Sequence, residues 1–118
     1  MQEESAIERL REICLALPDA VEKPFGGHTA PCFRVRDKLF VMVGEEQKTV
    51  TFKAGQGVQQ ALVESEPDRF FIPAYVGHKG WVGARLDVDH DWEEIAELVE
   101  ESYRLIAPRS LSARIPEP

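Results

Sequence analysis

The feature that most constrains the fold is an alternation of apolar and polar residues in the middle of the chain. Residues 32–36 and 49–53 place apolar side chains at every second position, and residues 39–43 between them are apolar throughout. Period-two alternation is typical of a strand with one buried face, and turn-forming residues at 37–38 and 44–48 separate the segments. The sequence therefore predicts an antiparallel meander of three strands.

Two further elements follow the meander. Residues 58–65 form a short amphipathic pattern that predicts a helix, and residues 81–86 alternate again, which predicts a fourth strand. Pro67 and Pro73 bracket the intervening segment, and proline is not accommodated in a central strand. The segment 77–80 has glycine at both ends and is expected to be an exposed loop.

An amphipathic helix is expected near each end of the chain. Ser5 followed by Glu8 is a capping-box pattern, and apolar residues then recur at three- and four-residue steps, which predicts a helix over 5–16. Asp91 starts a second such pattern, with an acidic opposite face, that continues to about residue 105.

These elements predict an α+β fold: an antiparallel sheet with two terminal helices packed on one face, plus a short helix between strands. The assignment depends on strand register, because a shift of one residue would exchange the two faces. The helices would then cover Phe33, Val35, Val50, Phe52, Val82, Ala84 and Leu86. The opposite face would carry Arg34, Arg36, Thr49, Thr51, Lys53, Trp81 and Arg85.

The chain of 118 residues is long enough for one domain, which we place at 1–110, with a flexible tail at 111–118. The acidic, polar start does not resemble a secretory signal. Cys14 and Cys32 lack a metal-ligand spacing and are expected to be free, buried thiols in a reducing compartment. We therefore expect a cytoplasmic protein that does not associate with membranes.

Charge is distributed unevenly along the chain. The net charge is −7, which disfavours a general nucleic-acid binder because phosphate binding depends on lysine and arginine. Residues 32–86, however, hold eight cations against six anions, so the excess of acid belongs to the two ends.

Three stretches resemble the MmcQ/YjbR family of small bacterial domains: His28–Val35 with Lys38 and Phe40, Pro73–Tyr75 with Gly80–Val82, and Ser102–Pro108. In this order they span roughly residues 8–110. The resemblance implies a CyaY-like (frataxin-like) architecture and DNA binding through paired hairpin wings. In this chain the wings would be the turns near Asp37-Lys38 and at Glu45–Lys48, and acidic residues stand in both.

The first candidate site is a nucleic-acid interface. Guanidinium groups, ammonium groups and an aromatic plane on one sheet face suit phosphate neutralisation and base stacking. Its candidate residues are Arg34, Arg36, Lys38, Lys48, Lys53, Lys79, Trp81 and Arg85. The alternative is a solvated face whose arginines pair with acids, with Trp81 covered by the 66–76 loop.

The second candidate site is a ligand pocket formed by His28, Tyr75, His78 and Trp81 beside the glycine-bordered loop, which suits an anionic or planar ligand. The alternative is a buried Tyr–Trp contact with an exposed loop tip. No metal-ligand cluster, nucleophile motif or cofactor fingerprint appears, so no metal, cofactor or catalytic residue is predicted. The sequence predicts a monomeric, non-enzymatic module that binds DNA or single-stranded nucleic acid; the alternative partner is a protein or a small anionic ligand.

Overall fold

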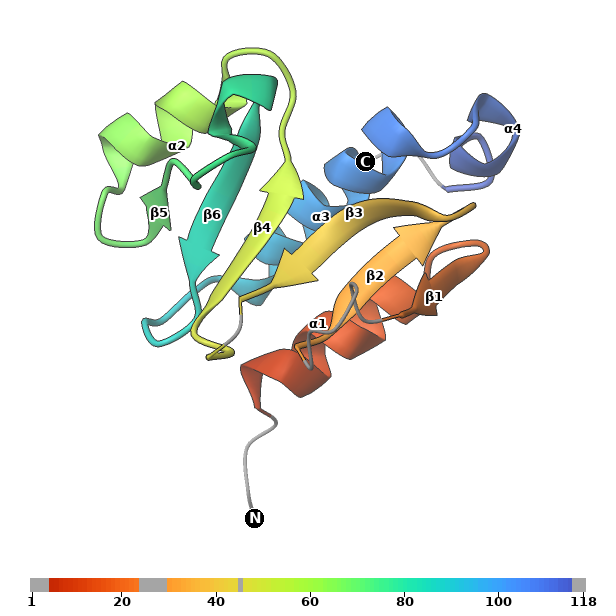
Figure 1. Cartoon of the computed structure of the whole chain (residues 1–118), viewed down its shortest axis with the longest axis horizontal. Helices are drawn as coiled ribbons and strands as arrows, with labels where there is room; N and C mark the ends of the chain where they lie inside the picture. Colours follow the sequence, from red (N-terminus) through yellow and green to blue (C-terminus); the bar gives the residue numbers. More distant parts are fainter. Residues whose placement is uncertain (1–4, 24–29, 45, 116–118) are drawn as a thin grey trace.

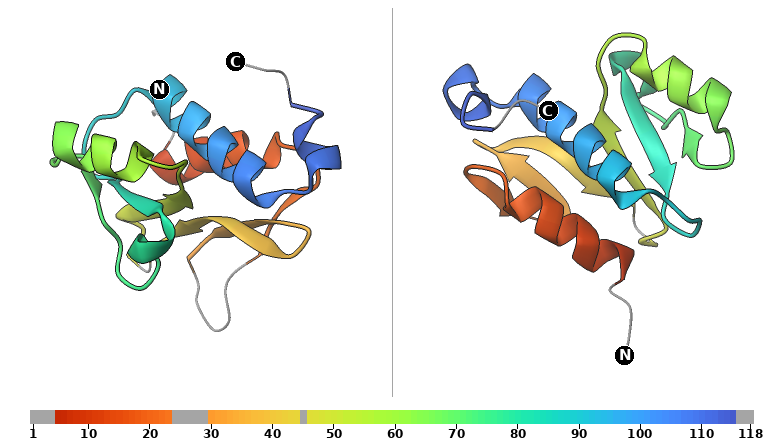
Figure 2. Two further views of the ribbon diagram at one scale, coloured as in Figure 1. Left: turned by 90° about the horizontal axis from the view of Figure 1, so that it is seen from above. Right: turned by 180° about the vertical axis from the view of Figure 1, so that it is seen from behind.

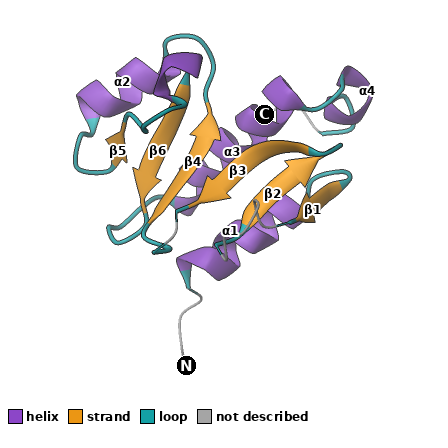
Figure 3. Cartoon of the chain, in the orientation of Figure 1, coloured by secondary structure: helices purple, strands orange, loops and turns teal. Residues whose placement is uncertain are grey.

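The computed structural model describes residues 5–23, 30–44 and 46–115. Four strands follow the first helix, and helical and strand elements are mixed in the second half of the chain, as Figures 1 and 3 show. The helical elements are α1 (Ala6–Leu15), α2 (Val58–Ser65), the 3₁₀ turn η1 (Gly77–Lys79), α3 (Trp92–Ile106) and α4 (Arg109–Ser112). The strands are β1 (Ala20–Glu22), β2 (Cys32–Val35), β3 (Lys38–Val43), β4 (Thr49–Lys53), β5 (Phe70–Phe71) and β6 (Trp81–Arg85).

The strands form one six-stranded sheet in the order β1-β2-β3-β4-β6-β5, and every neighbouring pair is antiparallel. The predicted meander is β2-β3-β4, and the predicted fourth strand is β6. The proline-bracketed segment contributes only the two-residue edge strand β5, as expected for a segment that cannot run through the centre of a sheet. The α+β fold class is confirmed.

Both terminal helices lie on the same face of the sheet (Figure 2). Helix α3 packs on β3 and β4, whereas α1 packs on β1 and against α3. Helix α2 lies beside the β5 edge. No helix among the described residues combines the length and apolarity that crossing a bilayer requires.

The predicted inward face of the sheet is confirmed. Its six residues on β2, β4 and β6 are fully shielded from solvent: Phe33, Val35, Val50, Phe52, Val82 and Ala84. Leu86, which follows β6, is half-buried. Cys14 and Cys32 are free and buried, as expected, and burial raises the pKa of the Cys14 thiol.

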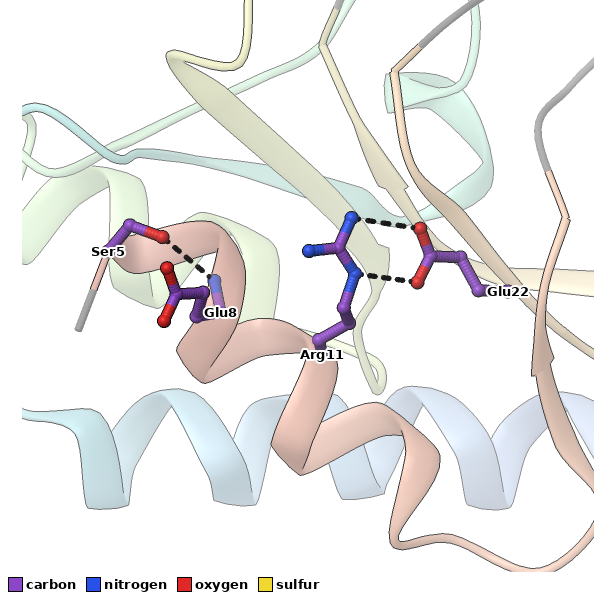
Figure 4. Close-up of polar contacts among 4 residues, drawn as sticks. All are labelled: Ser5, Glu8, Arg11 and Glu22. Carbon is purple, nitrogen blue, oxygen red and sulfur yellow. Dashed lines mark hydrogen bonds and ion pairs between the residues drawn. The ribbon is translucent and has the colours of Figure 1, made fainter.

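Capping and one ion pair hold α1 in place (Figure 4). The Ser5 hydroxyl accepts a hydrogen bond from the Glu8 backbone N–H at 3.1 Å, as the capping pattern predicts. Further along α1, the Arg11 guanidinium donates to both carboxylate oxygens of Glu22 on β1, at 2.7 and 3.1 Å. This bidentate pair ties α1 to the edge strand beneath it.

The hairpin turn between β2 and β3 differs from its prediction by one residue. Arg36 and Asp37, rather than Asp37 and Lys38, occupy the turn, with φ of 50° and 66°. Two consecutive positive φ angles are typical of a type I′ turn, whose twist matches that of the flanking strands. Arg36 therefore belongs to the turn and not to a strand face, and Lys38 opens β3.

The prediction of a flexible tail from residue 111 was wrong for the residues that the structure describes. The helical turn α4 follows Pro108, and it leaves Leu111 only 4% and Ile115 only 7% exposed. Both side chains belong to the main apolar core. Proline fits the position just before α4 because a helix start needs no N–H there, so Pro108 ends α3 and still permits another turn.

Ser102 of α3 is buried and bridges β3 and β4 at the point where these two strands stop pairing directly. Direct pairing of β3 with β4 runs from Val43↔Val50 to Val41↔Phe52, and the next pair in this register would be Phe40 with Lys53. There the Ser102 hydroxyl donates to the Phe40 carbonyl at 2.7 Å and accepts from the Lys53 N–H at 3.0 Å. Ser102 is fully buried and takes the place of a direct strand-to-strand hydrogen bond.

The neighbouring residue, Tyr103, connects α3 to the segment after α1 and to β3. Its hydroxyl donates to the Pro18 carbonyl at 2.6 Å, and its ring packs edge-on against Phe40 with centroids 5.5 Å apart. Burial is the main cause of the raised pKa of Tyr103, and the nearby Asp19 carboxylate adds to it.

We expect Ser102→Ala to lower the free energy of unfolding by about 2 kcal/mol, because two buried backbone groups would lose their partner. Urea unfolding followed by tryptophan fluorescence measures this change. Ser112→Ala is the matched control, since its hydroxyl bonds only to the exposed Arg109 carbonyl at 3.2 Å. Equal stability of the two variants would show that water replaces the Ser102 bridge.

Candidate functional site

The face of the sheet without α1 and α3 is less open than the sequence suggests. Trp81 pairs with Lys53 in the β4–β6 register but is only 9% exposed. Of the two alternatives for Trp81, the covered side chain therefore holds, and the indole ring does not offer an exposed plane for base stacking. Beside it, a Cβ on Gly83 would lie 2.3 Å from the Phe71 ring, and the Arg85 guanidinium lies 5.0 Å from the centre of that ring. Edge strand β5 therefore lays Phe71 over β6, and the missing side chain at Gly83 makes room for it.

The two predicted wings lie at opposite ends of the sheet. The β2–β3 turn carries Arg36 and leads into Lys38, whereas the β3–β4 turn carries Lys48, and an antiparallel meander puts successive turns at opposite ends. Arg85 lies with Lys48, because it pairs with Thr49 at the start of β4. Glu45 lies outside the described residues.

Several predicted cations are already engaged by this chain. Arg36 forms an ion pair with Asp19 at 3.3 Å, and Lys48 lies 3.9 Å from Glu46. Arg34 donates to the Asp37 carbonyl at 3.1 Å. The reading in which arginines of this region pair with acids therefore holds for Arg36.

Three predicted residues do come together around one depression. Lys53, His78 and Lys79 line a pocket of about 670 Å³ between the start of α2 and η1, with Leu105 of α3 also in its wall. We call this the α2 pocket. Lys53 reaches it from the last position of β4, where β3 and β4 have parted, and His78 and Lys79 reach it from η1.

The start of α2 and the residues just before it form one wall of the α2 pocket. The segment Gly55-Gln56-Gly57 precedes α2, and Gly57 caps the helix with φ of 83° and no side-chain hydrogen bond. Among the described residues no acceptor is found for the N–H groups of Gln59 and Gln60, both of which line the pocket. Unpaired N–H groups in a first helical turn carry partial positive charge.

The opposite wall of the α2 pocket is η1, and Gln59 of α2 fixes its position. The Gln59 side-chain amide donates to the Gly77 carbonyl at 2.8 Å and to the Trp81 carbonyl at 2.6 Å. Both of its N–H groups are thereby used, and η1 is tied to α2. Gly80 closes the turn with φ of 89°, a conformation that disfavours other residues.

The pocket is cationic but not uniformly so. Within the described chain neither Lys53 nor Lys79 forms an ion pair. One carboxylate lies close by: Glu101 Oε1 is 3.7 Å from the position that a Cβ on Gly55 would take. No group of acidic, histidine or cysteine side chains that could hold a metal occurs in the described part of the chain.

The predicted pocket of four aromatic and histidine residues is not assembled as expected. Tyr75 is 92% exposed, and neither Tyr75 nor Trp81 lines the α2 pocket. The Trp81 carbonyl accepts a hydrogen bond from Gln59. Because Tyr75 is not buried, the alternative of a buried contact between Tyr75 and Trp81 is also excluded. His28 lies outside the described residues. Gln59 was missed, although the Gly-Gln-Gly segment before a predicted helix is a signal for such a loop.

These features define a small α+β domain with one cationic, glycine-bordered pocket at the start of its middle helix. The chain belongs to the YjbR family, whose model matches residues 15–105, as the sequence resemblance predicted. No curated protein matches the chain.

A solved structure supports the same fold. The Deinococcus radiodurans protein DR2400, a DUF419 domain of the same family, has a TM-score of 0.77 and 20% sequence identity. The match covers 86% of this chain and 78% of that protein. At this identity the likeness concerns the fold alone.

We expect Gln59→Leu to loosen η1, because the carbonyls of Gly77 and Trp81 would both lose a donor. The free energy of unfolding should fall by about 1 kcal/mol, and amide hydrogen exchange in 77–80 should accelerate. Gln60→Leu is the matched control, since Gln60 is exposed and its side chain makes no hydrogen bond in the described structure. Equal exchange in both variants would contradict this role of Gln59.

Proposed function

We propose that the protein is a non-enzymatic binding module that takes a small anionic ligand into the α2 pocket. The observation that carries this proposal is the convergence of Lys53 and Lys79, both without an ion pair in the described chain, on one pocket. A phosphate or carboxylate group there would meet two ammonium groups and the first N–H groups of α2.

The size and lining of the pocket indicate a ligand larger than a single ion. A volume of about 670 Å³ falls within the usual range of small-molecule sites. Gln56 and Gln60 supply exposed amides, and Leu105 supplies an apolar surface. We therefore propose an organic anion whose charged group meets the lysines and whose polar remainder meets the glutamines.

No catalytic role is part of this proposal. The groups around the pocket are ammonium, amide, imidazole and backbone, and none of them is paired as a nucleophile with a base. The two buried free thiols suit a reducing compartment, so we propose that the module works in the cytoplasm.

We expect inorganic pyrophosphate, used as a simple anionic probe, to shift the amide NMR signals of residues 55–60 and 77–80. Lys53→Ala and Lys79→Ala should each weaken binding about tenfold, because each removes a charged hydrogen-bond donor. Lys48→Ala is the matched control, since Lys48 lies at the opposite end of the sheet. Shifts elsewhere, or equal binding by all three variants, would contradict the proposal.

Nucleic acid is the second candidate ligand, and one arrangement favours it. Strand β3 begins where its antiparallel neighbour β4 ends, so Lys38 lies at the same end of the sheet as Lys53. Lys79 beside Lys53 extends this group, whereas Arg36 in the adjoining turn is already paired with Asp19. The phosphates of one nucleic-acid strand would contact these three lysines, using one hairpin wing rather than two.

In that case, affinity for a short single-stranded oligonucleotide should fall steeply with salt. The log–log slope changes by about 0.7 for each single-strand phosphate neutralised, so Lys38→Ala should flatten it by about that amount. Lys38 does not line the α2 pocket, so pyrophosphate binding should be unchanged in the same variant. A slope that Lys38→Ala leaves unaltered would remove the nucleic-acid candidate.

A further inference from the structure

The segment between β5 and η1 presents two large apolar side chains to solvent. Tyr75 is 92% exposed and Ile72 is 57% exposed. The segment projects on the side of the sheet away from α1 and α3, as the left view of Figure 2 shows. We call Ile72 and Tyr75 the loop patch.

The backbone of Tyr75 is strained. Its φ is 68°, in the left-handed region that bulky residues rarely adopt. In the described structure the Tyr75 side chain forms no hydrogen bond, ring contact or ion pair that would offset this cost. Backbone strain that no contact within the fold compensates is a reason to look for a function at that residue.

The loop patch is nevertheless firmly held. The buried Pro73 accepts a hydrogen bond through its carbonyl from the Gly77 N–H at 3.0 Å, and the Val76 N–H donates to the Ala74 carbonyl at 2.7 Å. Ile72 lies directly on the backbone of Gly77, because a Cβ there would be 2.6 Å from Ile72 Cγ2. The backbone at Tyr75 is therefore held in one conformation, which lowers the backbone entropy that a partner must remove on binding.

Charge beside the loop patch is positive. The exposed Lys79 lies four residues after Tyr75, and Lys53 lines the α2 pocket together with Lys79. The chain as a whole carries a net charge of −7, so this region differs in sign from most of the molecule. A partner with acidic residues would be attracted here and repelled elsewhere.

We propose that the loop patch is a docking surface for an acidic protein segment that carries a large apolar anchor. The anchor would lie against Tyr75 and Ile72, and acidic side chains would meet Lys79 and His78. Tyrosine is enriched among the residues that dominate binding at protein interfaces. A protein segment is favoured over nucleic acid because Ile72, half of the patch, offers no plane for a base.

This inference goes beyond the anion-binding proposal and does not depend on it. Tyr75 does not line the α2 pocket, so Tyr75→Ala should bind pyrophosphate as the original chain does. The two proposals can therefore fail separately.

The test is selection of peptides from a random phage-displayed library on the immobilised full chain. We expect the recovered peptides to share acidic residues beside an aromatic or large aliphatic residue. As synthetic peptides they should bind at least about thirtyfold more weakly to Tyr75→Ala, since truncation of a dominant interface residue has an effect of this size. Leu15→Ala is the control, because Leu15 is also an exposed apolar residue, at 46%, but lies on α1.

A second variant separates binding from folding. Tyr75→Gly should raise the urea midpoint of unfolding, because glycine adopts a positive φ without strain, and should still lose peptide binding. Gain of stability with loss of binding is a result that a merely structural tyrosine would not produce.

Several results would overturn the proposal. These are failure to enrich any peptide, recovery of neutral or basic peptides, and peptides that bind Tyr75→Ala as well as the original chain. Concentration-dependent dimerisation that Tyr75→Ala abolishes would assign the patch to a second copy of this chain. Tyr75-dependent sedimentation with anionic phospholipid vesicles, without peptide binding, would assign it to a lipid surface.

Discussion

The Ser102 hydroxyl is the contact on which the arrangement of the sheet and the pocket depends. It lies where β3 and β4 stop pairing, and it supplies the donor and the acceptor that the parted strands no longer give each other. Because the strands can part without leaving buried polar groups unsatisfied, the end of β4 is free to turn away from β3. That divergence places Lys53 beside Leu105 and the start of α2, which is where the pocket forms.

The sheet and its buried face could be predicted because local periodicity decides them. Phe33, Val50 and Val82 are buried as their alternation requires, and one buried face is enough to set the register of a strand. The predicted position of the β2–β3 turn was wrong by one residue. The choice between Arg36-Asp37 and Asp37-Lys38 depends on the twist of the two flanking strands, which the residue types do not indicate. Ile115 was misjudged because its burial depends on a distant surface of the core and not on its neighbours in the chain.

The candidate site could be predicted only in part, for a similar reason. Positive charge in the middle of the chain made Lys53 and Lys79 candidates, and strand pairing decides that these two cations line one pocket. For Trp81 both an exposed and a covered side chain were open, because alternation does not reveal what covers the second face. The Gly-Gln-Gly segment could indicate a loop before α2 but not the role of Gln59, because that role comes from two carbonyls 18 and 22 positions away in the chain.

The two sheet edges have a consequence for how this domain can meet other proteins. β1 has three residues and β5 has two, so within the described residues neither edge strand offers a long row of unpaired backbone groups. Edges this short are poor templates for another strand, which protects the domain from edge-to-edge aggregation. It also disfavours a partner that extends the sheet by β-strand addition and favours recognition of this molecule through side chains.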